Sequence, residues 1–114
     1  MTANSIAALR ARQAQLANQQ AAVAGADRAL AQLLADVHAA MRLGARRLDA
    51  IAGEIDAAAA RGDGLAVDTP LGVRELQRFL LVKQREMAAI VADACEIARA
   101  KSVELRNLRT FYTA

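Results

Sequence analysis

Residues 30–51, LAQLLADVHAAMRLGARRLDAI, decide the fold because their apolar side chains recur at intervals of three and four residues. The pattern continues as a seven-residue repeat toward both ends of the first half of the chain. A repeat of this length predicts a long helix packed side by side with another helix. Its d positions are Leu9, Leu16, Val23, Leu30, Val37, Gly44 and Ile51, and its a positions are Ile6, Gln13, Gln20, Asp27, Leu34, Met41, Leu48 and Ile55.

The apolar character of this repeat changes along the chain. Gln13, Gln20 and Asp27 occupy a positions, whereas both positions are mostly large and apolar from Leu30 onward. We therefore expect tight packing at residues 30–58. Two arrangements stay open for residues 1–25: projection beyond the second helix, which the polar a positions favour, or folding back at Gly25 as a third short helix.

A single clear interruption, RGDGLAVDTP at residues 61–70, separates two helical regions. Gly62 suits a left-handed helix C-cap, Asp68 or Thr69 an N-cap, and Pro70 the first helical turn, where its missing N–H is not needed. We expect an all-α helical hairpin in one domain, residues 1–114, with a first helix at about 5–60, a loop at 61–69 and a second helix at about 70–108. The tripeptide Arg61-Gly62-Asp63, which some adhesion receptors recognise, is interpreted as coincidence.

The second helix is apolar over a wider arc than one helical neighbour requires. Its predicted seam is interrupted by charged residues, and further large apolar residues lie off that seam. An apolar surface that the hairpin does not cover predicts a further helix against it, which would complete a four-helix bundle. The seam residues are Val73, Leu76, Leu80, Met87, Ile90, Ala94, Ile97 and Leu108; the interruptions are Lys83, Lys101 and Glu104; the residues off the seam are Phe79, Leu81, Val82, Val91 and Leu105.

Composition and charge narrow the classes of function. The chain is 55% hydrophobic but only 3% aromatic, with a net charge of +3, and most of its apolar residues are Ala. Acidic and basic residues are interspersed along both halves, whereas nucleic-acid modules concentrate Lys and Arg on one face. A solvated helix surface is therefore favoured, and a nucleic-acid partner is not.

No set of side chains predicts catalysis, a metal or a cofactor. The chain has one His, His38, and one Cys, Cys95, whereas a structural zinc site needs about four such ligands. Residues 1–10 lack the features of a cleaved signal peptide, and Arg and Asp interrupt every apolar run. We expect a non-enzymatic cytoplasmic protein without cofactor, small-molecule substrate or membrane span; export without a cleaved signal stays open.

The stretch TPLGVRELQRFLLVKQREM at residues 69–87 resembles an uncharacterised family of small helical proteins and C-terminal domains from mycobacteria and related actinobacteria. The size and helix-loop-helix plan are also similar to the small secreted proteins of type VII (WXG100-like) systems, which pair as hairpins into four-helix bundles. The chain departs from that second group because it has no Trp-x-Gly turn, and only Thr113 and Ala114 follow Tyr112, where the group carries an acid. The first resemblance implies no activity, and the second implies association with a possible link to type VII secretion.

These observations predict a helical interaction protein that forms a homodimer or binds a heterologous helical partner. The expected partner-binding residues are Phe79, Val82, Val91 and Leu105. The alternative is an adaptor for nucleic acid or another acidic surface, whose anion-binding residues would be Arg42, Arg46, Arg47, Arg74 and Arg78.

Overall fold

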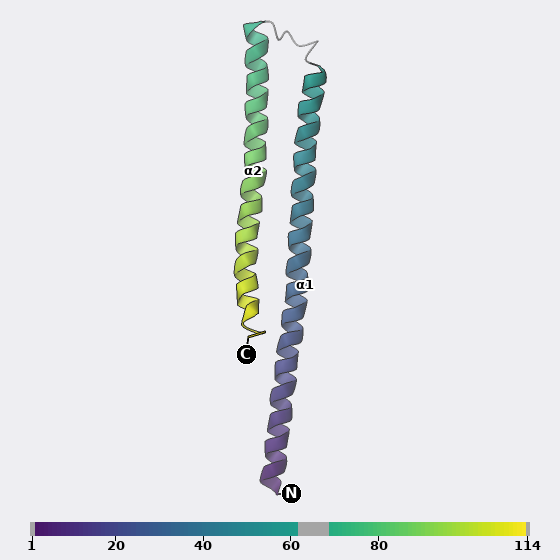
Figure 1. The fold of residues 1–114 in the computed structure, drawn as a ribbon, viewed down its shortest axis with the longest axis vertical. Coiled ribbons are helices and arrows are strands. Elements are labelled where there is room, and N and C mark those ends of the chain that lie inside the picture. Colours follow the sequence, from purple (N-terminus) through teal and green to yellow (C-terminus); the bar gives the residue numbers. More distant parts are fainter. Residues whose placement is uncertain (1, 62–68, 114) are drawn as a thin grey trace. The chain divides into compact units, whose positions relative to one another are not determined.

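The structure, a computed structural model, describes residues 2–61 and 69–113. Two helices account for nearly all of them: α1 at Ala3–Ala60 and α2 at Pro70–Arg109 (Figure 1). No strand occurs in these two ranges, so the all-α prediction is confirmed. The predicted caps at Gly62 and Asp68, the Arg61-Gly62-Asp63 tripeptide beyond Arg61, and most of the predicted loop lie outside the described residues.

Side-chain and backbone oxygens cap the N-terminus of each helix. The Ser5 amide donates to the Thr2 hydroxyl at 3.3 Å, and the Gly72 amide donates to the Thr69 hydroxyl at 3.1 Å. Pro70 follows Thr69 in the first turn of α2, where no backbone donor is required. Thr69, one of the two residues predicted as a cap, therefore begins the second helix.

α1 is continuous through Gly25, so residues 1–25 do not form a separate third helix. No described glycine has a positive φ, and a Cβ placed on Gly25 would meet no atom within 4 Å. Every residue from 2 to 24 is exposed. This segment, which we call the N-terminal arm, is the projecting helix that the polar a positions favour.

The fold consists of two compact units, and each contains a part of both helices. Unit 1 comprises Met1–Asp36 with Ala100–Ala114, and unit 2 comprises Val37–Arg99. In unit 2, Arg47 Nη1 lies 3.2 Å from Asp93 Oδ2, and Lys83 pairs with Glu54. Because the α2 partner number falls as the α1 number rises, the helix segments of unit 2 are antiparallel.

Unit 1 has the same antiparallel order. Lys101 Nζ lies 3.4 Å from Asp36 Oδ2, and the Tyr112 hydroxyl donates to Asp27 Oδ1 at 2.5 Å. Each unit is thus a helical hairpin pairing of the kind predicted. The core is thin, since the described apolar residues that are buried are few and small to medium in size: Ala26, Leu33, Ile51, Ala58 and Ile90.

The predicted a positions of α1 are wrong in the middle of the helix, whereas the d positions Val37 and Gly44 are half-buried as predicted. Leu34 and Met41, both a positions, are 59% and 69% exposed, whereas Leu33 is buried. Near the C-terminus Ile51 is buried and Ile55 is half-buried, as predicted. Leu34 and Ile55 lie three heptads apart, and a straight helix drifts by about 20° per heptad, so over this interval the a-side contact moves by about 60° toward the preceding residue, Leu33.

Gly44 faces a side chain of the neighbouring helix. A Cβ placed on Gly44 would lie 4.0 Å from Ile90 Cγ2, and Ile90 is only 5% exposed. The side chain of Ile90 therefore fills the space over Gly44.

Candidate interaction surfaces

Lys83 lies in the helix interface of unit 2 and was wrongly predicted to interrupt it. Its ammonium pairs with Glu54 of α1 and, at 3.2 Å, with Glu86 one turn along α2. Lys83 Nζ also lies 5.5 Å from the ring centroid of Phe79. Hydrogen bonding to Glu54 raises the pKa of Lys83, against the opposing effect of burial, and Glu86 adds to the rise. The aliphatic stem is buried while the charged head is satisfied by carboxylates.

Lys101 makes a corresponding cluster in unit 1. Its ammonium lies 3.4 Å from a carboxylate oxygen of Asp36 and 3.4 Å from one of Glu104. Burial lowers the pKa of Lys101, but the bond to Asp36 and the charge of Glu104 outweigh it and raise the pKa overall. The pKa of Asp36 is lowered, chiefly by the hydrogen bond from Gln32 and also by Lys101. Lys101 is therefore part of the interface as well.

The predicted partner-binding residues differ in exposure. Val82, Val91 and Leu105 are 44%, 56% and 50% exposed, whereas Phe79 is half-buried beside Lys83. Val82 and Val91 belong to unit 2 and Leu105 to unit 1. Unit 2 also exposes Met41 and Leu48 of α1, two predicted seam residues that α2 leaves uncovered. Its exposed apolar surface thus includes residues of both helices.

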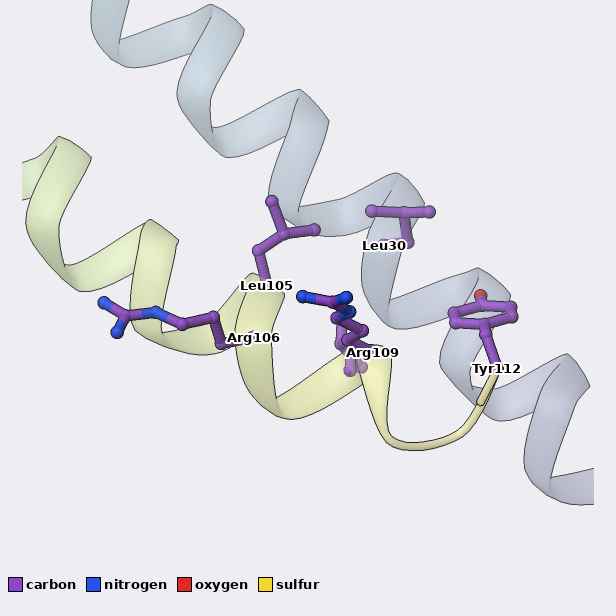
Figure 2. A pocket seen from close by; sticks show the side chains of 6 residues that line it. Leu30, Leu105, Arg106, Arg109 and Tyr112 are labelled. Carbon is purple, nitrogen blue, oxygen red and sulfur yellow. The ribbon is translucent and has the colours of Figure 1, made fainter. Parts of the chain in front are cut away.

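Leu105 borders a shallow hollow in unit 1 (Figure 2). The hollow has a volume of about 300 Å³ and is mostly apolar. Tyr112 closes one end, held by its hydrogen bond to Asp27, which raises the pKa of the Tyr112 hydroxyl. The lining residues are Leu30, Leu105, Arg106, Leu108, Arg109 and Tyr112.

The five arginines predicted to bind anions all lie in unit 2, and all are exposed. Arg47 pairs with Asp93, whereas the other four form no ion pair with a described residue. Unit 2 contains nine basic and nine acidic residues and is neutral overall. These five arginines therefore lie in a unit that carries no excess positive charge.

The net charge belongs to unit 1, with six basic and three acidic residues. All three acids are engaged: Asp27 with Tyr112, and Asp36 and Glu104 with Lys101. Arg10, Arg12, Arg28, Arg106 and Arg109 form no ion pair with any residue that the structure describes. Arg12 donates instead to Gln15, and Arg106 to the Ser102 carbonyl.

The apolar stripe of the N-terminal arm is uncovered. Ile6, Leu9, Leu16 and Val23 are 41%, 54%, 43% and 38% exposed. Leu9, Leu16 and Val23 are d positions, and the next d position, Leu30, lines the hollow with Leu105 and Leu108 of α2. The row of d positions on α1 is therefore covered by α2 at Leu30 and uncovered at Leu9, Leu16 and Val23.

Within the ranges 2–61 and 69–113, no group of three or more His, Cys, Asp or Glu side chains is arranged to hold a metal ion. Cys95 is exposed. No described helix is long and apolar enough to cross a membrane.

Related proteins are uncharacterised. MT0028 of Mycobacterium tuberculosis is 58% identical over 110 residues, which cover 96% of this chain and 92% of that protein. Rv0739 and Rv0026 of the same species are 34% and 33% identical over 92% and 90% of this chain, but the chain spans only 39% and 22% of their lengths. No solved structure gives a significant match. The similarity to type VII proteins stays a prediction, whereas the mycobacterial resemblance is confirmed: residues 2–114 match the domain of unknown function DUF4226, and the chain belongs to that family.

Proposed function

We propose that this protein is a non-enzymatic helical interaction protein, which self-associates through the exposed apolar surface of unit 2. Two hairpin segments would pack these surfaces together and form a four-helix bundle. The same residues would serve a heterologous helix of similar character. This function requires no catalysed reaction, because the protein would act by binding another helix in a defined position.

The observation that carries this proposal is the exposure of large apolar side chains on both helices of unit 2. Met41 and Leu48 lie seven residues apart on one side of α1, and Val91 is exposed on α2. Val82 lies nine residues, or two and a half turns, before Val91, so it is on the opposite side of α2 and belongs to another surface. Burying apolar surface contributes about 25 cal/mol per Å², so these side chains would supply a substantial driving force for association. Large apolar side chains that are exposed on both helices of a pair commonly mark an interface.

The charge of unit 2 supports association between identical copies. Two copies of a neutral unit repel each other less than two copies of the positively charged unit 1. Exposed acids and arginines around the apolar side chains would form the polar rim of the contact.

Light scattering on a sizing column, across a dilution series, tests the proposal. We expect a concentration-dependent dimer for the unchanged protein and a monomer for Met41→Glu and Val91→Glu. Val103→Glu is the matched control, because Val103 is a 50% exposed α2 valine in unit 1. Far-UV circular dichroism should show unchanged helix content in all three. A monomer at every concentration, or a dimer that survives Val91→Glu, contradicts self-association through this surface.

A second candidate is the adaptor for nucleic acid or another polyanion. It is supported by the absence of an ion pair at Arg42, Arg46, Arg74 and Arg78 among the described residues. Binding would weaken steeply with salt, because contacts to phosphates release counterions. Retention of duplex DNA at low salt that is lost on Arg42→Glu with Arg46→Glu would favour this function, and no retention at low salt would exclude it.

A link to type VII secretion is a further proposal that rests on size and hairpin plan. It predicts that the protein appears in culture filtrate only when a type VII system is functional. Its absence from the filtrate of a strain that exports other substrates of that system would count against the link.

A further inference from the structure

We infer that the N-terminal arm, residues 2–24, is a docking site for an acidic amphipathic helix of another protein. This surface lies in unit 1 and is separate from the unit 2 surface through which we propose self-association. The inference extends the proposed function by naming a second contact and the chemistry of its partner.

The first argument is continuity with an existing helix interface. Leu9, Leu16 and Val23 extend the d stripe of α1, and Leu30, one heptad further, already faces α2 leucines across the hollow of unit 1. α2 ends at Arg109, and Tyr112 contacts α1 at Asp27, so the described chain supplies no residue to cover the arm. The arm therefore has the same kind of apolar stripe as the part of α1 that packs against α2, but no described helix packs against the arm.

The arm is about 34 Å long at 1.5 Å per residue, which is three heptads. Three heptads are a common minimum for a recognisable helix-pairing pattern. Its Ala-rich sequence has high helix propensity, so the arm can remain helical before a partner binds. A preformed helix loses less conformational entropy on binding than a disordered segment does.

The second argument is charge. The arm contains two charged residues, Arg10 and Arg12, and no acid. Arg10 follows the d residue Leu9 and is an e position, while Arg12 precedes the a residue Gln13 and is a g position. These positions flank the apolar stripe on its two sides, and side chains there select the partner of a paired helix. A partner with Glu or Asp at its own flanking positions is therefore favoured.

A second copy of the arm does not meet this requirement. Two arms would bring together four arginines and no carboxylate, so neither copy would offer an opposite charge to the other. The acids elsewhere in unit 1 are already bonded to Lys101 or Tyr112. The charge pattern thus points to a different chain.

A membrane surface and nucleic acid fit less well. Helices that lie in a membrane interface combine a strongly apolar face with several Lys or Arg residues, whereas Gln13 and Gln20 interrupt this stripe and the arm has no aromatic residue. Single-stranded nucleic acid is bound by aromatic stacking together with a run of positive charge, and the arm has neither. The two glutamines suit a helical partner with polar residues at the facing positions.

A designed probe tests the inference on the full chain. The probe is a 21-residue labelled peptide with Leu at each d position, Gln at each a position, Glu at each e and g position and Ala elsewhere. Fluorescence anisotropy should show saturable binding at low ionic strength. The same peptide with Lys in place of Glu should bind at least tenfold more weakly. Phosphatidylglycerol vesicles and single-stranded DNA are the comparison ligands.

Variants of the arm separate this contact from self-association. Leu16→Glu, and Arg10→Glu combined with Arg12→Glu, should each weaken binding of the acidic peptide at least tenfold without changing the mass seen by light scattering. Leu43→Glu, at a 52% exposed α1 leucine in unit 2, should leave peptide binding unchanged. The light-scattering series with Val91→Glu then tests self-association alone, so either proposal can fail without the other.

Four outcomes overturn the inference. They are no saturable binding of the acidic peptide, equal binding of the Lys peptide, a preference for vesicles or DNA over the peptide, and loss of self-association on Leu16→Glu. The last result would show that a second copy, and not an acidic helix, covers the arm.

Discussion

Lys83 and Lys101 occupy equivalent places 18 residues apart on α2. Each ammonium contacts a glutamate three residues further along its own helix and an acid on α1, and these α1 acids, Glu54 and Asp36, are also 18 residues apart. Eighteen residues correspond to five turns of an α-helix. One such cluster therefore fixes the register in each unit.

This relationship predicts that Lys83→Glu lowers the melting temperature by several degrees, because a third carboxylate would face Glu54 and Glu86 in a partly desolvated site. Glu54→Lys in the same chain should recover most of the loss by restoring opposite charges. Thermal unfolding followed by circular dichroism measures both. A double variant no more stable than the single one would show that the pairing with Glu54 is unimportant.

Ile90 and Val91 are adjacent on α2 but differ in burial, at 5% and 56% exposed. Ile90→Ala should cost about 2–4 kcal/mol in the free energy of unfolding, because it leaves a cavity over Gly44. Val91→Ala should cost no more than about 0.5 kcal/mol in the monomer. Urea unfolding at a concentration below that of self-association compares them, and similar losses for the two would contradict the burial seen at this interface.

Gly44→Ala should stabilise the protein by up to about 1 kcal/mol, since alanine is the better helix former and its Cβ would make an ordinary contact with Ile90 at 4.0 Å. Gly25→Ala is the control, because no neighbour lies within 4 Å and the gain there should come from helix propensity alone. Gly44→Phe should instead destabilise by displacing Ile90. Stabilisation by phenylalanine would show that the helices are farther apart at this point.

Tyr112 is the only tyrosine of a chain without tryptophan, so its ionisation can be followed directly by ultraviolet absorbance. The hydrogen bond to Asp27, followed by burial and the charge of Asp27, raises its pKa above the ordinary value of 10.0. The stability from this bond is therefore fully present below pH 10 and is lost as the pH rises through the raised pKa. Asp27→Asn should lower the titration midpoint, whereas Asp49→Asn should leave it unchanged. Equal midpoints for the unchanged protein and Asp27→Asn would exclude the bond.

Local signals made the helices and their ends predictable. Thr69 and Pro70 mark the beginning of α2 by their own chemistry, and apolar spacing identifies a helix without knowledge of what it touches. The exposure of Val82 and Val91 also agrees with their predicted place off the seam. Their role in binding stays a prediction.

The d positions of α1 from Leu30 to Ile51 were predictable from the repeat, whereas the a positions were not, because these depend on whether the helices supercoil. A strict seven-residue repeat puts Leu34 in the seam, whereas the drift of a straight helix puts Leu33 there. Lys83 was misjudged for a related reason: a lysine in an apolar pattern looks like an interruption until the carboxylate opposite it is known. The repeated Lys-x-x-Glu at residues 83–86 and 101–104 is the signal that could have identified both clusters.

The five-turn spacing also allows one specific misalignment of the hairpin, in which one helix is displaced along the other by 18 residues. If the hairpin closed one spacing out of line, Lys83 would meet Asp36, and Lys101 would meet residue 18, which is Asn18. An amide offers Lys101 no negative charge, so in the displaced alignment Lys101 would lose its acid on α1 and keep only Glu104 of its own helix. The neutral side chain of Asn18 therefore disfavours this displaced alignment, and Asn18→Asp would remove that penalty.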